Sequence, residues 1–394
     1  MNRPFEICAP PFGFNGDTGY VWPTAEQQWL LRAALLPAPA GLDAWEKWKS
    51  LADIDHLDDG SFRLIPLLYR NLKRIGAESE LLGRFKGIYR RAWYQNQIAL
   101  HKLSKILGFF REAETPTLIL KGAALALLYY KDIGLRPMAD IDVLVPVNKA
   151  VDTIHLLRKS GWKPEVDCPR RMTSDYLQTV KACNLVRDES DVKLDLHWHV
   201  FQECLEPDAD ADLWESSVPV AVGEESSHAL SAPDQLLHIC SHAMEWNAVA
   251  PMRWVADAVA VLSNAPGLDW NRVLGQIRKR NLVLTMQHML PYLRKLADAP
   301  IPEHVLSELQ GFPVSQTERN WVEVRTRGIS RLTVRDLFRV RYRLYRRSAF
   351  SRRFRPAVLG FPRYMQLVWG IDNWRDVPKR SIRTIWNTFH AHTS

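Results

Sequence analysis

The sequence lacks several features that would place it at a membrane or outside the cell. No apolar run reaches the roughly 18–20 residues that a membrane-spanning helix requires. The most apolar window, TLILKGAALALLYY, is interrupted by Lys121. The N-terminal stretch MNRPFEICAPPFGF has neither the charged start nor the apolar centre of a signal peptide. We therefore expect a cytoplasmic chain without a transmembrane segment.

Cysteine is scarce and irregularly spaced. The 394 residues include five cysteines, and none belongs to a C-x-x-C pair. An odd number of scattered cysteines is not typical of a disulfide framework or a structural zinc site. Buried free thiols in a reducing compartment are the expected state of Cys8, Cys168, Cys183, Cys204 and Cys240.

Three common nucleotide and hydrolase motifs are also missing. The sequence contains no P-loop, no G-x-G-x-x-G and no G-x-S-x-G. Their absence argues against a P-loop kinase, a dinucleotide-dependent enzyme and an α/β-hydrolase.

Charge is distributed unevenly along the chain. The net charge is +8, but residues 325–394 carry 17 Lys and Arg against three Asp, a net +14 that leaves −6 for residues 1–324. The stretch RDLFRVRYRLYRRSAFSRRFRP mixes arginines with aromatic residues. An anionic partner, RNA or a membrane surface, would suit this segment, and so would packing on the domain with the arginines in solvent. Peripheral membrane attachment is thus an alternative location.

Changes in the pattern of apolar and polar residues divide the chain into four consecutive regions. Residues 1–112 and 216–300 have helical periodicity, and residues 301–394 form the basic, helical C-terminal region. In the second region, 113–215, TLIL, IDVLV, WKPEV, NLVRD and VKLDLHWHV are typical of strands, and AALALLYYK and NKAVDTIHLLRKSG of helices. The pattern predicts an α+β fold with a mixed sheet flanked by helices. VPVAVGEESSHALSAPD is expected to be a loop.

The tetrapeptide ADID occurs twice, at 52–55 and 139–142. The first copy continues as HLDDG, a polar context that predicts solvated surface. We expect the same of DADAD at 208–212. The second copy continues as VLVP and reads as a strand, so Asp140 and Asp142 project from one face of it. Two carboxylates on one rigid face require a cation, and hard oxygen ligands suit Mg²⁺ or Mn²⁺.

A third carboxylate comes from VKLDLHWHV, where Asp195, His197 and His199 share the face opposite Leu194 and Leu196. If this strand neighbours the first one, the three carboxylates can hold two metal ions for phosphoryl displacement. His197 is a candidate partner that orients a carboxylate.

Phosphate groups require a separate binding site. Lys121 and Gly122 end a strand and open a helix, where free backbone N–H groups attract anions. Arg136, just before the Asp-x-Asp strand, is a second candidate phosphate ligand.

The combination LKGAALALLYYKDIGLRPMADIDVLV and LDLHWHV resembles the nucleotidyltransferase superfamily related to DNA polymerase beta. It is most similar to a bacterial group of uncharacterised nucleotidyltransferases. The resemblance implies that Asp140 and Asp142 bind metal, that Asp195 is the third carboxylate and a candidate general base, and that Gly122 lies under the phosphates of an NTP.

Ala123 stands where the superfamily usually has Gly or Ser, so a hydroxyl that often contacts the phosphate is missing. The resemblance implies transfer of a nucleoside monophosphate to an unidentified small-molecule, protein or tRNA acceptor. Two alternatives stay open: a catalytically silent module that holds an anionic partner, which Ala123 favours, and a toxin that modifies tRNA.

Overall fold

The computed structural model describes residues 6–8, 21–165, 172–187, 190–245, 252–326, 333–354 and 356–382. The expectation for Cys168 lies outside them. The chain divides into two compact units, each assembled from three chain segments. Unit 1 comprises Met1–Ile98, Leu125–Met138 and Ala232–Ile329, and unit 2 comprises Ala99–Ala124, Ala139–Ser231 and Ser330–Ser394. This division differs from the four consecutive regions expected from the pattern of apolar and polar residues, because segments distant in sequence pack together in each unit.

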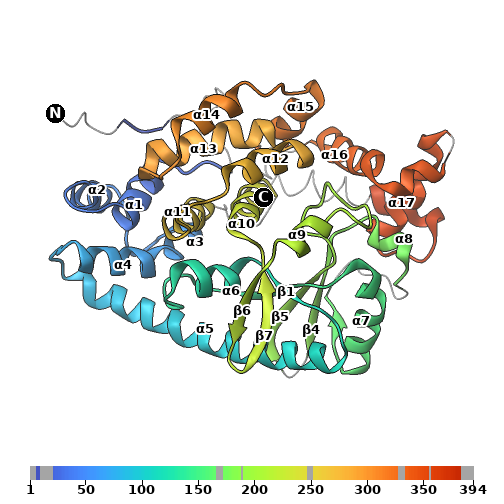
Figure 1. Ribbon diagram of the computed structural model, residues 1–394, viewed down its shortest axis with the longest axis horizontal. Coiled ribbons are helices and arrows are strands. Elements are labelled where there is room, and N and C mark those ends of the chain that lie inside the picture. The colour runs from blue at the N-terminus through green and yellow to red at the C-terminus, as the bar shows by residue number, and fades with distance from the viewer. Residues whose placement is uncertain are drawn as a thin grey trace. The chain divides into compact units, whose positions relative to one another are not determined.

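Unit 2 contains a seven-stranded mixed sheet in the order β3-β4-β5-β2-β1-β7-β6. Its strands are β1 Leu118–Ile119, β2 Asp140–Leu144, β3 Lys163–Pro164, β4 Ala182–Arg187, β5 Ser190–His197, β6 Val218–Val222 and β7 Glu225–Ala229. Pairs β2–β5 and β1–β7 are parallel, and the other neighbours are antiparallel. Figure 1 shows these strands gathered into one sheet with α7, Val147–Lys159, beside it. The α+β fold class is confirmed.

Strands β2 and β5, at the centre of the sheet, each have one apolar face, and this face is buried. Ile141 and Val143 of β2 and Leu194 and Leu196 of β5 are at most 2% exposed. They alternate with the polar side chains of the same strands, as predicted, so the opposite face of the sheet carries the charged residues.

The expectation of a loop at 218–234 was wrong. Residues 218–222 and 225–229 form the hairpin β6–β7, which Gly223, with φ +60°, turns between the strands. Val220 and Val222 are buried and alternate with exposed residues. Arg111 donates two hydrogen bonds to Glu225, and the hydroxyls of Thr117 and Ser227 lie 2.8 Å apart. Tertiary contacts thus stabilise strands whose polar, Gly-containing sequence suggests a loop.

The remaining elements of unit 2 are helical. They are the C-terminal part of α5 (Leu81–Glu112), most of α6 (Lys121–Leu125), α8 (Ser174–Leu177), α9 (Ala211–Glu215), α16 (Val334–Arg347), η3 (Ala349–Arg353), η4 (Ala357–Gly360), α17 (Phe361–Val368) and η5 (Trp374–Asp376).

Helices are the only regular secondary structure in the described residues of unit 1. It contains α1 (Ala25–Leu35), α2 (Ala40–Lys49), α3 (Asp59–Phe62), α4 (Ile65–Arg74), the N-terminal part of α5, the π-helix η1 (Ala126–Tyr130), α10 (Ala232–Ala243), α11 (Trp254–Asn264), α12 (Trp270–Arg280), α13 (Val283–Ala297), α14 (Glu303–Gln310) and α15 (Gln316–Arg325).

The start of the first helix follows the sequence signal. The Thr24 hydroxyl accepts from the Gln27 backbone N–H at 3.2 Å, and the Gln27 side chain accepts from the Thr24 N–H at 3.0 Å. This reciprocal capping box satisfies two N–H groups that the helix itself leaves unpaired.

The basic C-terminal segment is part of unit 2 and contacts the rest of it: the Tyr364 hydroxyl donates to the Thr179 carbonyl at 3.5 Å, and Arg353 forms an ion pair with Asp175. Tyr345 of α16 is fully buried, and its ring lies 5.5 Å from Phe361 and 5.3 Å from Tyr364. Most arginines of α16 are exposed or half-buried. This arrangement agrees with packing on the domain, one of the three alternatives that the sequence left open. Residues 383–394 lie outside the described part of the chain.

Among the described helices, none is both long and apolar enough to cross a bilayer.

Candidate functional site

The polar face of the sheet in unit 2 brings two aspartates together. In the parallel pairing of β2 with β5, Asp142 lies opposite Asp195 and Asp140 lies opposite Lys193. Asp142 is 2% exposed, and the side chain of Asp195 is 18% exposed. The structure thus places Asp195 beside Asp142 on a neighbouring strand. Metal binding by the predicted trio of Asp140, Asp142 and Asp195 stays a prediction.

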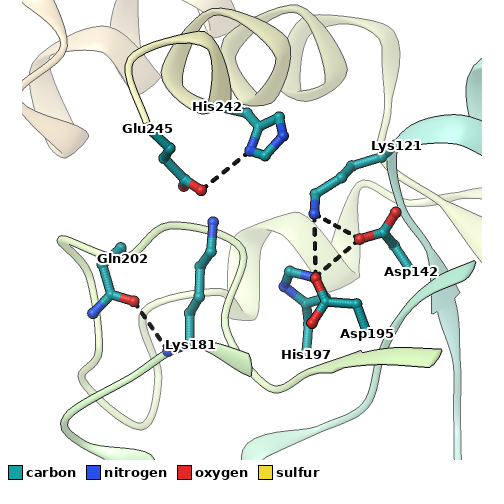
Figure 2. A network of polar contacts seen from close by, with 8 residues as sticks. All are labelled: Lys121, Asp142, Lys181, Asp195, His197, Gln202, His242 and Glu245. Atoms are coloured by element: carbon teal, nitrogen blue, oxygen red, sulfur yellow. Dashed lines mark hydrogen bonds and ion pairs between the residues drawn. The ribbon is translucent and has the colours of Figure 1, made fainter. Parts of the chain in front are cut away.

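Lys121, the first residue of α6 and two residues after the end of β1, reaches this pair. Strand β1 is antiparallel to β2, and the Leu120 N–H donates to the Asp142 carbonyl at 3.1 Å, which directs the next residue to the carboxylates. The Lys121 ammonium donates to Asp142 Oδ1 at 2.6 Å and to Asp195 Oδ2 at 3.4 Å. Figure 2 shows Lys121 pointing toward both carboxylates. The backbone of Lys121 is left-handed, with φ +45°, a conformation that costs a non-glycine residue about 1 kcal/mol or more.

His197 completes the cluster from the end of β5. Its Nε2 donates to Asp195 Oδ2 at 2.8 Å and lies 3.3 Å from Asp142 Oδ1 (Figure 2). The ring is fully buried. The prediction treated His197 as a partner that orients a carboxylate, and the contact with Asp195 has that geometry.

The charges of the cluster stabilise one another. Burial opposes ionisation of Asp142 and Asp195, but Lys121 and His197 outweigh it and lower the pKa of both carboxyl groups. Burial also opposes the imidazolium, yet Asp195 outweighs it and raises the pKa of His197. Both carboxylates are therefore ionised at neutral pH.

The donor set suits a divalent cation. One ligand atom from each of Asp142, Asp195 and His197 can be chosen so that all three lie within 4.8 Å of one another. It is the only such group of His, Cys, Asp and Glu in the described residues. Ionised carboxylate oxygens are the ligands that Mg²⁺ and Mn²⁺ prefer, and Asp142 and Asp195 supply them, while His197 donates to Asp195. The residues present thus fit the expected metal.

Three other predicted site residues, Asp140, Gly122 and Ala123, lie outside the group of possible metal ligands. Asp140 is exposed, two residues before Asp142 on the same face of β2, and is not part of this group of three. Gly122 and Ala123 are buried at the start of α6. Their roles, and the role of Asp140 as a metal ligand, stay predictions.

Arg136 belongs to unit 1 and contacts an aspartate of the same unit. Its guanidinium donates two hydrogen bonds to Asp257, at 2.8 and 2.9 Å, and Tyr130 donates to the same carboxylate at 2.8 Å. Arg136 is only 6% exposed. Binding of a phosphate by Arg136 stays a prediction, and the geometry gives the residue a structural contact.

Two residues that the sequence did not single out lie beside the carboxylates. Asn184 pairs with Asp195 across the antiparallel strands β4 and β5, so its exposed side chain shares the polar face of the sheet. Lys181 directly precedes β4, and its charge further lowers the pKa of Asp195. No local motif marks either residue, because both depend on the pairing of β4 with β5.

The two other acidic runs have different environments. Asp53 and Asp55 of the first ADID are exposed and contact His56 and Arg84, which confirms the prediction of solvated surface. The same prediction was wrong for Asp210 of DADAD, which is 5% exposed. Its carboxylate accepts hydrogen bonds from His199 Nδ1 at 3.0 Å and from the Val200 N–H at 3.2 Å.

Comparison with known proteins identifies the family of the chain. A family model described as "Uncharacterised nucleotidyltransferase" matches residues 61–298, more than half of the chain, and this range includes the positions of the four cluster residues. The chain belongs to this nucleotidyltransferase family.

Solved structures also include proteins that are similar to this chain. An antigenic nucleotidyltransferase-like protein from Paracoccidioides brasiliensis aligns over 55% of this chain and 98% of that chain, with 13% identity and a TM-score of 0.32. No curated protein matches the sequence of this chain.

Proposed function

We propose that this family member transfers a nucleoside monophosphate from an NTP to an acceptor in the cytoplasm, with Mg²⁺ or Mn²⁺ bound at Asp142 and Asp195. The observation that carries the proposal is the pair of ionised carboxylates on adjacent parallel strands, contacted by Lys121 and His197. Asp140 is the further candidate ligand on the same face of β2.

Each residue has a defined part in this proposal. When bound, the metal would neutralise phosphate charge and activate the attacking oxygen. Asp142 and Asp195 supply the oxygen ligands, and His197 holds Asp195 in one orientation through the 2.8 Å hydrogen bond. Lys121 carries a cation that can contact phosphate oxygens. Gly122, Ala123 and Arg136 are the further candidates for binding the nucleotide.

Nucleotide transfer is tested by incubating the protein with each α-labelled NTP and Mn²⁺, and by measuring pyrophosphate release together with labelling of protein or added tRNA. We expect Asp142→Asn to lower pyrophosphate release by at least 100-fold. The matched control is Asp53→Asn, which changes the same residue type in the other ADID, on exposed surface. Its release should equal that of the unmodified protein.

The outcomes separate the candidate functions. Full release by Asp142→Asn would contradict the proposal. Metal-dependent NTP binding without release by the unmodified protein would indicate the catalytically silent module instead. Labelling of tRNA would identify the acceptor as RNA.

A further inference from the structure

The long helix α5, Leu81–Glu112, is almost free of acidic residues. It carries seven Lys and Arg, and Glu112 at its end is the only acid. Arg84, Lys86, Arg90 and Arg91 lie in unit 1, and of these Arg84 forms an ion pair with Asp55. The N-terminal part of α5, through residue 98, belongs to unit 1. A helix that only needs a solvated face usually alternates charges of both signs, because i,i+4 pairs of opposite charge stabilise it. A row of like charges therefore suggests an anionic partner.

Two aromatic side chains are exposed among these charges. Trp93 is 43% exposed and Tyr94 is 63% exposed. Lys86 precedes Trp93 by seven residues, and Arg90 precedes Tyr94 by four. These are the spacings of residues on one side of a helix, so the four side chains share one side of α5. The opposite side of the same turns is buried through Phe85, Ala92 and Asn96.

The neighbouring helix α4 extends this basic area within unit 1. The rings of Tyr69 on α4 and Tyr89 on α5 are 5.7 Å apart, so the two helices are in contact. Burial and Asp132 raise the pKa of Tyr89, and the charge of Arg70 on α4 partly offsets this rise. Arg70 and Lys73 are both exposed. We define the α4/α5 surface by its exposed side chains, Arg70, Lys73, Lys86, Arg90, Arg91, Trp93 and Tyr94.

We propose that the α4/α5 surface binds single-stranded nucleic acid. Arginine and lysine would contact the phosphates, and Trp93 and Tyr94 would stack on unpaired bases. In the described chain, no carboxylate forms an ion pair with Lys86, Arg90 or Arg91, so their charges are available. The exposed apolar side chains are chiefly aromatic, with Ile98 at 38% the aliphatic exception, and this composition favours base stacking over insertion into a bilayer.

The binding is tested by fluorescence anisotropy with a labelled 20-nucleotide RNA of mixed sequence, in buffer without NTP or divalent metal. The result is therefore independent of nucleotide transfer at Asp142. Arg90→Glu/Arg91→Glu should weaken RNA binding at least tenfold. The matched control Lys47→Glu/Lys149→Glu changes the net charge equally at exposed sites on α2 and α7, and should weaken it less than twofold.

Stacking is tested separately from charge. Trp93→Ala/Tyr94→Ala should weaken RNA binding at least fivefold and leave binding of inorganic polyphosphate within twofold. The control Leu51→Ala truncates an exposed apolar residue elsewhere in unit 1 and should change neither. Equal loss for RNA and polyphosphate, or no loss for RNA, would overturn the role of the aromatic residues.

A vesicle assay distinguishes the lipid alternative. Sedimentation with vesicles of phosphatidylcholine and phosphatidylserine should leave the protein in the supernatant at physiological salt. Vesicle binding that depends on Arg90 and Arg91, in a protein that does not bind RNA, would overturn the proposal.

Discussion

Asp142 and Asp195 lie opposite each other on the parallel strands β2 and β5, and the Lys121 ammonium contacts both. Two carboxylates that lie opposite each other on adjacent strands repel each other unless a cation lies nearby. Lys121 provides that cation in the structure, and a divalent metal would add to it or replace it. The free energy of unfolding should therefore depend both on Lys121 and on a divalent metal bound at the two carboxylates.

Lys121→Met tests whether a metal can replace the ammonium. Removing one partner of a buried ion pair leaves uncompensated charge, so the free energy of unfolding should fall by about 3 kcal/mol in the presence of EDTA. Millimolar Mg²⁺ should reverse at least half of the decrease in Tm, because Mg²⁺ binds the same carboxylates. Thermal unfolding of both proteins with and without Mg²⁺ measures this, and a variant whose Tm ignores Mg²⁺ would argue against a metal at this pair.

His197→Ala should weaken Mn²⁺ binding by about 10–100-fold, because residues that orient a metal ligand typically contribute that much. Isothermal titration with Mn²⁺ gives the affinity. His56→Ala is the matched control, since His56 makes a comparable contact with Asp53 on exposed surface. Unchanged affinity in His197→Ala would show that the hydrogen bond to Asp195 does not position the ligand.

Asp257 should make unit 1 sensitive to acid. Burial opposes its ionisation, but Arg136 and Arg253 outweigh burial and lower the pKa of Asp257. A carboxyl group whose pKa is lower in the folded state stabilises the fold fully above its unfolded pKa of about 3.9, and this contribution is lost as the pH falls toward the folded value. Urea unfolding between pH 7 and pH 3 should therefore show a stability decline that is shallower in Asp257→Asn.

The same variant should lose about 3–5 kcal/mol at pH 7, because Arg136 is left buried without its partner. Asp152→Asn, at an exposed position of α7, serves as the control with no change. Identical pH profiles for Asp257→Asn and the unmodified protein would contradict the role of this ion pair.

Asp210→Ala should destabilise unit 2 by about 2 kcal/mol, because His199 and the Val200 N–H lose a buried acceptor. Asp208→Ala, two residues earlier in the same acidic run but exposed, should change stability by less than about 0.5 kcal/mol. Chemical denaturation of the two variants gives the comparison. Equal effects would mean that the contact with His199 contributes little.

Alternation along single strands was sufficient to predict the polar face of the site. It placed Asp140 with Asp142, and Asp195 with His197, on the faces opposite Ile141 and Leu194, and the contacts of His197 with Asp142 and Asp195 agree with this. These inferences depend only on the period of two in an extended chain. The adjacency of β2 and β5 was a condition of the prediction, because pairing between strands some 50 residues apart is not encoded locally.

Contacts between residues that are far apart in the sequence explain which parts of the site could not be predicted from it. Arg136 precedes the Asp-x-Asp strand and looked like a phosphate ligand, but its contact is Asp257, 121 residues away. Asn184 and Lys181 lie beside the carboxylates only because β4 pairs with β5. Likewise, β6 and β7 form strands because β7 pairs with β1.

The occupancy of the carboxylate pair by a divalent cation is the claim on which the proposed function depends. Electron paramagnetic resonance of free Mn²⁺, titrated against equal concentrations of protein, measures it directly. We predict that Asp142→Asn/Asp195→Asn loses Mn²⁺ binding, whereas Asp53→Asn/Asp55→Asn, which removes the same charge from exposed surface, binds Mn²⁺ like the unmodified protein. Undiminished Mn²⁺ binding by Asp142→Asn/Asp195→Asn would contradict the account.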